Sequence, residues 1–138
     1  MMEMIQDLKE LTSNILETMF FLMQETEPIQ VVEDYKYAVS IQDPKVEIVL
    51  MFCGKTAAMM AENFIGMDEI SENDVIDTLK EAINIVAGNF IRSCMNDLQT
   101  KINIQFVIKD VGKINLGEYS TALLYYQEEP LNILLKME

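Results

Sequence analysis

The sequence predicts a single domain of the α+β class over residues 1–138. Two observations indicate that it contains both helices and strands. Apolar residues recur at helical spacing in residues 4–24 and in residues 71–96. Residues 46–53 and residues 101–109 instead carry continuous or alternating apolar residues, which favour strands. A chain of 138 residues can bury about two thirds of the surface that it exposes when unfolded, which is enough for one core.

The first half of the chain predicts a helix followed by two strands. The helix over residues 4–24 should end before Pro28, because proline disfavours helix in the residue that precedes it. Residues 31–42 are β-branched and partly alternating, and a turn signal at residues 43–44 separates them from the apolar run 46–53. We expect these two segments to form a hairpin.

Two further helices are predicted after the hairpin. The shorter one should cover residues 54 to about 65 and stop at Gly66. The longer one, residues 71–96, begins with Ser71 and Asp74, a pair that resembles a capping box, in which the serine hydroxyl accepts a hydrogen bond from a free backbone amide. Its apolar residues form one stripe at 3.6 residues per turn: Val75, Leu79, Ile83, Val86 and Phe90.

The last third of the chain predicts strands. After Asp97 the apolar period changes from helical to strand-like, and residues 101–109 alternate between apolar and polar positions. Residues 119–126 and residues 131–136 have the composition of two more strands, with turn signals between the segments.

Composition excludes several classes of function. The net charge of −13 argues against binding to nucleic acid, which needs basic residues against phosphate, and it disfavours anionic membrane surfaces. No apolar run approaches the ~20 residues of a membrane span. Acidic residues occupy the start of the chain, where a signal peptide would be basic, so we expect a cytoplasmic protein. The two cysteines, Cys53 and Cys94, are too few for a disulfide framework or a zinc site, and we expect both to be small buried side chains.

The candidate functional residues lie on the long helix, opposite its apolar stripe. They are spaced i, i+4, i+7 and i+11: Asp77, Glu81, Asn84 and Gly88. A glycine inside a helix costs about 1 kcal/mol relative to alanine, which suggests that something approaches the backbone closely there. Because the chain has no histidine, chemistry on this face must use carboxylates, amides or groups of a partner.

The spacing Asp77-x-x-x-Glu81-x-x-Asn84 is followed by a Gly88-Asn89 pair. This pattern resembles the active-site helix of the CheC/CheX/FliY family of chemotaxis phosphatases. The size of the chain and the order of its elements are most similar to the CheX branch. The resemblance implies a two-layer sandwich, in which two long helices pack on a mainly antiparallel sheet and the two halves form a pseudo-repeat.

The resemblance also implies a function, which is the dephosphorylation of a phosphorylated response-regulator receiver domain such as CheY in chemotaxis or two-component signalling. The receiver would supply the phosphoryl-aspartate, a Mg²⁺ ion and a lysine, and this chain would carry no cofactor or metal. In the family pattern Asn84 positions the attacking water and Glu81 pairs with the receiver lysine. Asp77 and Gly88 would contact the partner. A homodimer is also plausible from the family.

Other interpretations stay open at this point. The chain could be an adaptor or ligand-sensing module of the same fold that binds a receiver without turnover. Asp77 and Glu81 could support metal-dependent hydrolysis, although two carboxylates from one helix leave most ligand positions unfilled. The face could also be the solvated side of a helix in an unrelated α+β domain. One position departs from the family pattern, which has a proline about two dozen residues beyond the asparagine, where this chain has Val107.

The first helix contains a weak echo of the same spacing. Ser13-x-x-x-Glu17-x-x-Phe20 has phenylalanine where the asparagine should be. On the family reading this is a dead site, since phenylalanine cannot orient a water. The other interpretation of Phe20 is packing or a subunit contact.

Overall fold

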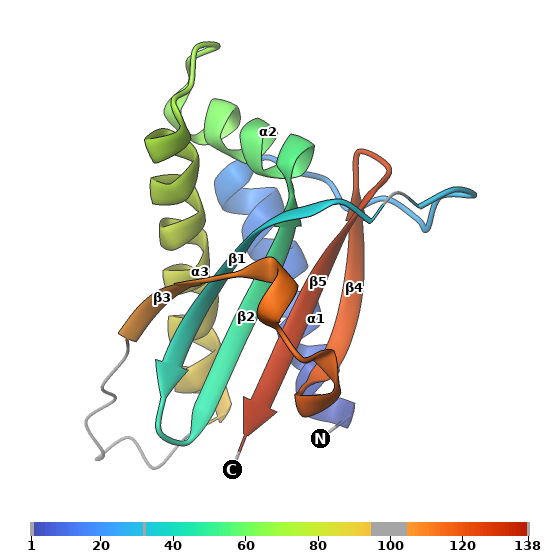
Figure 1. Ribbon diagram of the computed structural model, residues 1–138, viewed down its shortest axis with the longest axis vertical. Helices are drawn as coiled ribbons and strands as arrows, with labels where there is room; N and C mark the ends of the chain where they lie inside the picture. Colours follow the sequence, from blue (N-terminus) through green and yellow to red (C-terminus); the bar gives the residue numbers. More distant parts are fainter. Residues whose placement is uncertain (1, 32, 95–104, 138) are drawn as a thin grey trace.

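The computed structural model of the chain describes residues 2–31, 33–94 and 105–137 (Figure 1). Its helices and strands, in chain order, are α1 Met2–Phe20, β1 Tyr35–Asp43, β2 Val46–Cys53, α2 Gly54–Ile65, α3 Glu72–Cys94, β3 Gln105–Lys109, β4 Ser120–Tyr126 and β5 Glu129–Met137. Two short 3-10 helices, η1 Val111–Lys113 and η2 Leu116–Glu118, lie between β3 and β4. This set of elements confirms the α+β class.

The strands form one five-stranded sheet in the order β3-β1-β2-β5-β4, and every neighbouring pair is antiparallel. The predicted hairpin is confirmed, because β1 pairs with β2 from Tyr35 opposite Cys53 to Asp43 opposite Val46. The turn between β4 and β5 contains Gln127 and Glu128, whose φ angles of 52° and 67° give the left-handed geometry of a tight hairpin turn.

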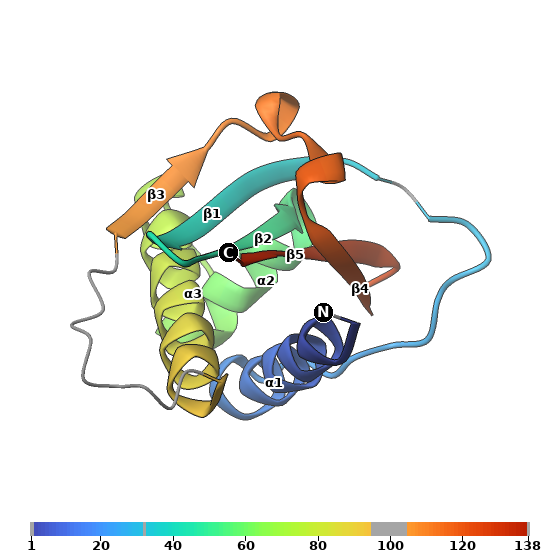
Figure 2. The same ribbon diagram turned by 90° about the horizontal axis from the view of Figure 1, so that it is seen from below.

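The helices lie on one face of this sheet, with α1 next to β4 and β5 and α3 next to β1 and β2 (Figure 2). The α2 helix contacts both of the others. The main core fills the space between the two layers, and its fully buried side chains include Leu8, Leu16, Phe20, Ile48, Leu50, Phe52, Leu79, Ile83, Val86 and Phe90. The predicted apolar stripe of α3 therefore faces the sheet.

The opposite face of the sheet is covered by the connection from β3 to β4, which crosses it with η1 and η2 (Figure 2). Val49 and Met51 of β2 form a second, smaller core on this face with Ala38 and Leu134, and residues of the connection such as Ile114 pack against it. The central strands are thus buried on both faces. This explains why β2 is an almost continuous apolar run rather than an alternating one.

The local signals for the ends of α2 and α3 are confirmed. The backbone amide of Ser71 donates to the carboxylate of Asp74 at 3.0 Å, and the amide of Asp74 donates to the hydroxyl of Ser71 at 3.1 Å, which together make a reciprocal cap. Gly66 ends α2 with a φ of 77° and donates its amide to the carbonyl of Glu62.

Two boundaries differ most from the predicted ones, by four residues each. The α1 helix ends at Phe20 instead of residue 24, because Phe21 adopts a left-handed φ of 57° and the amide of Leu22 donates to the carbonyl of Leu16. The β1 strand begins at Tyr35 instead of residue 31. The residues just before it are exposed acids, which have low strand propensity.

Some predictions fall outside the described residues. These are the end of the long helix at residues 95–96, the first part of the strand at residues 101–104, and the burial of the Cys94 side chain. Cys53 is buried as predicted, and burial is the main cause that raises the pKa of its thiol. No helix in the described ranges is long and apolar enough to cross a membrane.

Candidate functional site: the exposed face of α3

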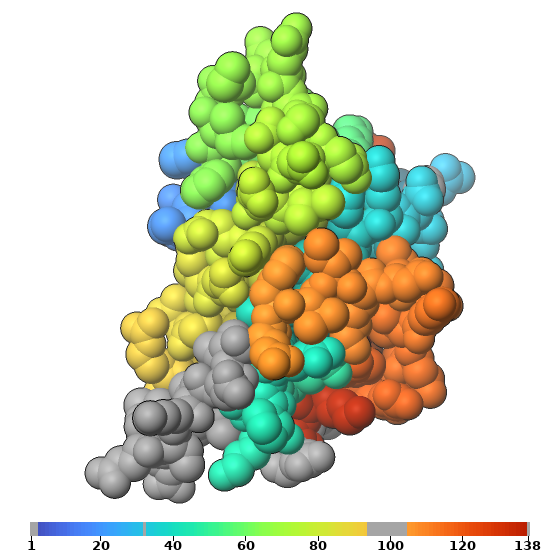
Figure 3. All heavy atoms as spheres, turned by 60° about the vertical axis from the view of Figure 1, so that its left-hand side comes forward, coloured from blue at the N-terminus to red at the C-terminus, as the bar shows by residue number. Residues whose placement is uncertain are grey.

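The predicted site residues lie together on the side of α3 that faces away from the core. Asp77, Glu81 and Asn84 are exposed and Gly88 is half-buried. Figure 3 shows this part of α3 along the front of the molecule, with β3 beside it. At a rise of about 1.5 Å per residue, Glu81 and Asn84 are about 4.5 Å apart along the helix axis, so their side chains are neighbours.

The polar ends of these side chains have no partner within the described part of the chain. Asp77 and Glu81 form no ion pair there, and neither they nor Asn84 form a side-chain hydrogen bond with any described residue. The neighbouring Asn89 differs, since its amide donates to the carbonyl of Ile85 at 2.7 Å. The carboxylate of Glu81 and the amide of Asn84 are therefore available to a partner without breaking a bond to any described residue.

The α3 helix is held firmly against the sheet at several points. The hydroxyl of Tyr37 on β1 donates to the carboxylate of Glu72 in the first turn at 2.8 Å. Burial, followed by this hydrogen bond, raises the pKa of Tyr37 to about 12. The ammonium of Lys80 lies 5.4 Å from the ring centre of Phe106 on β3. These contacts fix the orientation of the exposed face, as a site that positions small groups requires.

Gly88 leaves a bare stretch of backbone on the same face. A Cβ at this position would meet only Nη2 of Arg92, at 3.8 Å, which is an ordinary van der Waals contact. The residue also lies within a regular helix and has no positive φ. Packing inside the described chain therefore does not require glycine here, although glycine inside a helix costs about 1 kcal/mol relative to alanine.

The same face offers few ligands for a metal ion. Within the ranges that the structure describes, no group of three or more aspartate, glutamate or cysteine side chains is placed to hold one. Asp77 and Glu81 are the two carboxylates that line this side of α3.

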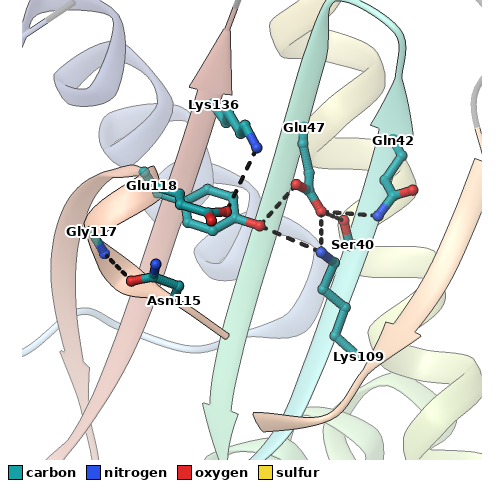
Figure 4. A network of polar contacts seen from close by, with 9 residues as sticks. Ser40, Gln42, Glu47, Lys109, Asn115, Gly117, Glu118 and Lys136 are labelled. Carbon is teal, nitrogen blue, oxygen red and sulfur yellow. Dashed lines mark hydrogen bonds and ion pairs between the residues drawn. The ribbon is translucent and has the colours of Figure 1, made fainter. Parts of the chain in front are cut away.

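Sequence reasoning missed a polar network on the other face of the sheet (Figure 4). The carboxylate of Glu47 on β2 pairs with the ammonium of Lys109 at 2.6 Å and accepts a hydrogen bond from the hydroxyl of Tyr119 at 2.8 Å. It also accepts bonds from Ser40 at 2.9 Å and Gln42 at 3.0 Å. The sign of this network in the sequence is a single glutamate, Glu47, inside the otherwise apolar run of β2.

The network makes Glu47 a structural carboxylate. Burial opposes its ionisation, but the hydrogen bonds from Lys109, Tyr119, Ser40 and Gln42 outweigh burial and lower its pKa. The pKa of Lys109 is raised, because the pairing with Glu47 outweighs the effect of burial. The network ties the β3–β4 connection to the sheet, on the side of the sheet away from α3.

The echo on α1 is not an open site. Phe20 is fully buried and its ring lies 5.1 Å from that of Phe64. The hydroxyl of Ser13 donates to the side-chain oxygen of Gln24 at 2.9 Å, and only Glu17 of the three is exposed. Phe20 therefore packs in the chain's own core, as one of the interpretations predicted.

Val107, where the family pattern has a proline, lies in the middle of β3 and pairs with Ser40 of β1. β3 is an edge strand, which is where a proline is tolerated in a sheet. A β-branched valine is well suited to the same position.

Solved structures share this fold along nearly the whole chain. A CheX chemotaxis protein from Vibrio vulnificus matches with a TM-score of 0.68 and 19% identity, covering 99% of this chain and 97% of that one. A CheX protein from Desulfovibrio desulfuricans matches with a TM-score of 0.68 and 15% identity, covering 99% of both chains. A structure of the CheX–CheY–BeF3–Mg²⁺ complex from Borrelia burgdorferi matches with a TM-score of 0.58 and 16% identity, covering 97% of both chains.

The fold, with two long helices on an antiparallel sheet, thus recurs in CheX structures of low sequence identity. A search of curated proteins finds no match to the sequence. The family model described as chemotaxis phosphatase CheX matches residues 37–123, which include most of β1, all of β2, α2 and α3, and the whole candidate site. Because this match covers more than half of the chain, the protein belongs to the CheX family of chemotaxis phosphatases.

Proposed function

We propose that this protein dephosphorylates a CheY-like receiver domain phosphorylated on aspartate. The observation that carries the proposal is the pair Glu81 and Asn84, which lies exposed and without a partner among the described residues, on the helix that bears the family spacing. The Borrelia burgdorferi structure supports the class of partner, since it contains a CheX protein together with CheY, BeF3 and Mg²⁺.

The proposed role of Asn84 is to position the attacking water. Its side-chain oxygen accepts a hydrogen bond from a water molecule, which then lies in line with the phosphorus and the leaving carboxylate. Phosphoryl transfer needs little covalent help from the protein, so a fixed geometry is the main contribution that one amide can make. The absence of histidine from the sequence fits this role, because positioning needs no general base on this chain.

Glu81 is proposed to bind a lysine of the receiver. A carboxylate beside a phosphoryl group is repelled unless a cation lies between them, and a lysine near the phosphoryl group would remove that repulsion. Asp77, one turn earlier on the exposed face, extends the contact. Gly88 lets the partner's backbone come close to α3. In this proposal the Mg²⁺ ion is held by the receiver, and a homodimer stays a prediction from the family.

The experiment is phosphate release from a panel of phosphorylated receiver domains with Mg²⁺, in the presence of the wild-type protein, Asn84→Ala or Asn89→Ala. Removing one positioned polar group should lower the rate by about 10²–10³, or about 3–4 kcal/mol. Asn89→Ala is the matched control, because it removes an exposed amide of the same helix that is already bonded to Ile85. It should keep the wild-type rate.

Two results would contradict the proposal. Wild-type turnover by Asn84→Ala would remove the role of this residue. Binding of a phosphorylated receiver with no faster release of phosphate would indicate a non-catalytic adaptor of the same fold.

A further inference from the structure

Arg92 extends the candidate site toward the end of α3. It is exposed, lies in the last turn of the helix and is the single arginine of the sequence. The helical repeat places it on the same side as Asp77, Glu81 and Gly88, about one turn beyond Gly88. Its Nη2 atom lies 3.8 Å from where a Cβ of residue 88 would be, so this end of the guanidinium lies beside Gly88.

This arginine has no acidic partner in the described part of the chain. The ion pairs found there join Lys109 to Glu47 and Lys136 to Glu118, and both use lysine. The positions where an acid would pair with Arg92 along the helix, three and four residues earlier, hold Asn89 and Gly88. A guanidinium without an acidic partner among the described residues is notable in a chain with 23 acidic and 10 basic residues.

The helix dipole explains only part of this arrangement. A cation in the last turn is stabilised by the dipole, but a lysine would serve that purpose equally well. Arginine differs because its planar group binds carboxylates through two parallel hydrogen bonds. Because residue 88 is a glycine, no side chain at that position comes between the guanidinium and a partner.

The charge of the side chains on this face changes from negative to positive between the start and the end of α3. Asp77 and Glu81 are negative, Asn84 is neutral and Arg92 is positive. A partner that docks along α3 therefore needs a cation opposite Glu81 and an anion opposite Arg92. The proposed function supplies the cation as the receiver lysine. The proposed function also implies acidic groups on the receiver, since a protein site that holds Mg²⁺ does so with carboxylate oxygens.

We propose that Arg92 binds a carboxylate at the rim of the receiver's phosphorylation site and, together with Glu81, sets the direction in which the receiver lies along α3. This inference rests on the proposed function. The Cα atoms of Asn84 and Arg92 are about 12 Å apart along the helix axis, so Arg92 contacts the rim while Asn84 reaches the water. Arg92 is thus a specificity-determining residue and acts on binding, not on the chemical step.

The test compares Arg92→Gln with Lys113→Gln. Both variants remove one positive charge, but Lys113 is exposed in η1 on the other side of the sheet from α3. Glutamine is a good helix former, so thermal unfolding of Arg92→Gln should fall only slightly below that of the wild type, by the small stabilisation that the cation gains from the helix dipole. In phosphate release from the same receiver, Arg92→Gln should raise KM about tenfold with kcat unchanged, as expected for a charge at the edge of an interface.

Direct binding supplies a second readout that does not need turnover. The dissociation constant for a receiver loaded with BeF3 and Mg²⁺ should rise by a similar factor in Arg92→Gln, and it should depend less steeply on salt than in the wild type. Lys113→Gln should show neither change, because the effect comes from a local pair and not from net charge.

The other outcomes distinguish failure of this inference from failure of the proposed function. A fall in kcat with KM unchanged would place the guanidinium on the phosphoryl group. Equal behaviour of Arg92→Gln and Lys113→Gln would leave Arg92 without a role in docking, even if Asn84→Ala had confirmed the phosphatase. If the wild type binds a receiver but releases no phosphate, the proposed function fails and the binding measurement still decides the role of Arg92. If it binds no receiver, both proposals fail.

Discussion

The two long helices carry the same spacing of side chains and use it in opposite ways. On α3 the three positions are Asp77, Glu81 and Asn84, and all are exposed. On α1 the third position is Phe20, which is fully buried against the ring of Phe64. The same helical geometry therefore gives an open face in one half of the molecule and a packing surface in the other.

The segment that follows α1 contributes to this difference. After α1 the chain turns back at Phe21, and Gln24 accepts a hydrogen bond from Ser13. The backbone of Glu25 then pairs with Tyr125 of β4, which holds this segment beside α1. The exposed face of α3 has no such tie to a described segment at its three polar positions. A spacing motif thus indicates a site only where its side chains stay uncovered.

The largest effect is expected from a substitution that removes a packing contact of α1. Phe20→Ala should lower the free energy of unfolding by about 3–5 kcal/mol, because it leaves a cavity beside Phe64 in the core. Asn84→Ala should change it by less than about 0.5 kcal/mol, as is usual for an exposed residue without partners. Urea unfolding of both variants measures the contrast. Equal stabilities would mean that Phe20 does not pack as described.

Two matched glutamate substitutions test whether the exposed face of α3 binds the receiver. Glu81→Gln removes the charge proposed to bind the receiver lysine and should lower kcat/KM by about 10- to 100-fold, as expected for a hydrogen bond between charged groups. Glu17→Gln makes the same change at the corresponding exposed position of α1 and should leave kcat/KM unaltered. Steady-state phosphate release checks both. A similar loss in Glu17→Gln would indicate that α1 also takes part.

Glu47 is a carboxylate that the fold uses internally, in contrast to Glu81. Glu47→Gln should lower the free energy of unfolding by about 1–2 kcal/mol at pH 7, because it breaks the pair with Lys109. Glu118→Gln, which affects an exposed pair with Lys136 at 3.7 Å, should change it by close to zero. Chemical denaturation of both variants distinguishes the two carboxylates.

The free energy of unfolding should also depend on pH differently in the wild type and in Glu47→Gln. The folded state lowers the pKa of Glu47, so its stabilising effect is complete above the ordinary glutamate pKa of about 4.3 and is lost as the pH falls toward the lowered value. In that window the wild type should lose stability faster than Glu47→Gln. Parallel pH profiles would show that Glu47 does not contribute in this way.

Gly88→Ala should have only a small effect on the free energy of unfolding, and the direction of that effect is informative. Alanine should raise the free energy of unfolding by up to about 1 kcal/mol, since nothing in the described structure obstructs a Cβ there. If a partner's backbone approaches this position, KM should rise in the same variant. Thermal unfolding and phosphate release together separate the two effects. A more stable protein with unchanged KM would leave Gly88 without a docking role.

The sequence predicted well the features that local chemistry decides. The cap formed by Ser71 and Asp74, the stop at Gly66 and the bounds of β2 depend on residues a few positions apart, and the structure confirms them. The exposed face of α3 followed from helical period alone. Its position was predictable, while the roles of Glu81 and Asn84 stay proposals.

The remaining features depend on contacts between distant segments. The early end of α1 involves the left-handed Phe21, which no residue type at that position signalled. The network of Glu47 joins β1, β2 and β3 with Tyr119, and its bond with Tyr119 forms because the β3–β4 connection crosses the sheet. The position of the Arg92 side chain beside Gly88 likewise required coordinates.

The most direct test of the central claim is the single-turnover rate of phosphate release at saturating Asn84→Ala, on a receiver that the variant binds as tightly as the wild type does. Saturation removes any effect on docking, so the rate reports only the step in which the water is positioned. The account predicts a loss of about 10²–10³ with unchanged affinity for the receiver bound to BeF3 and Mg²⁺. A wild-type rate under these conditions would contradict it.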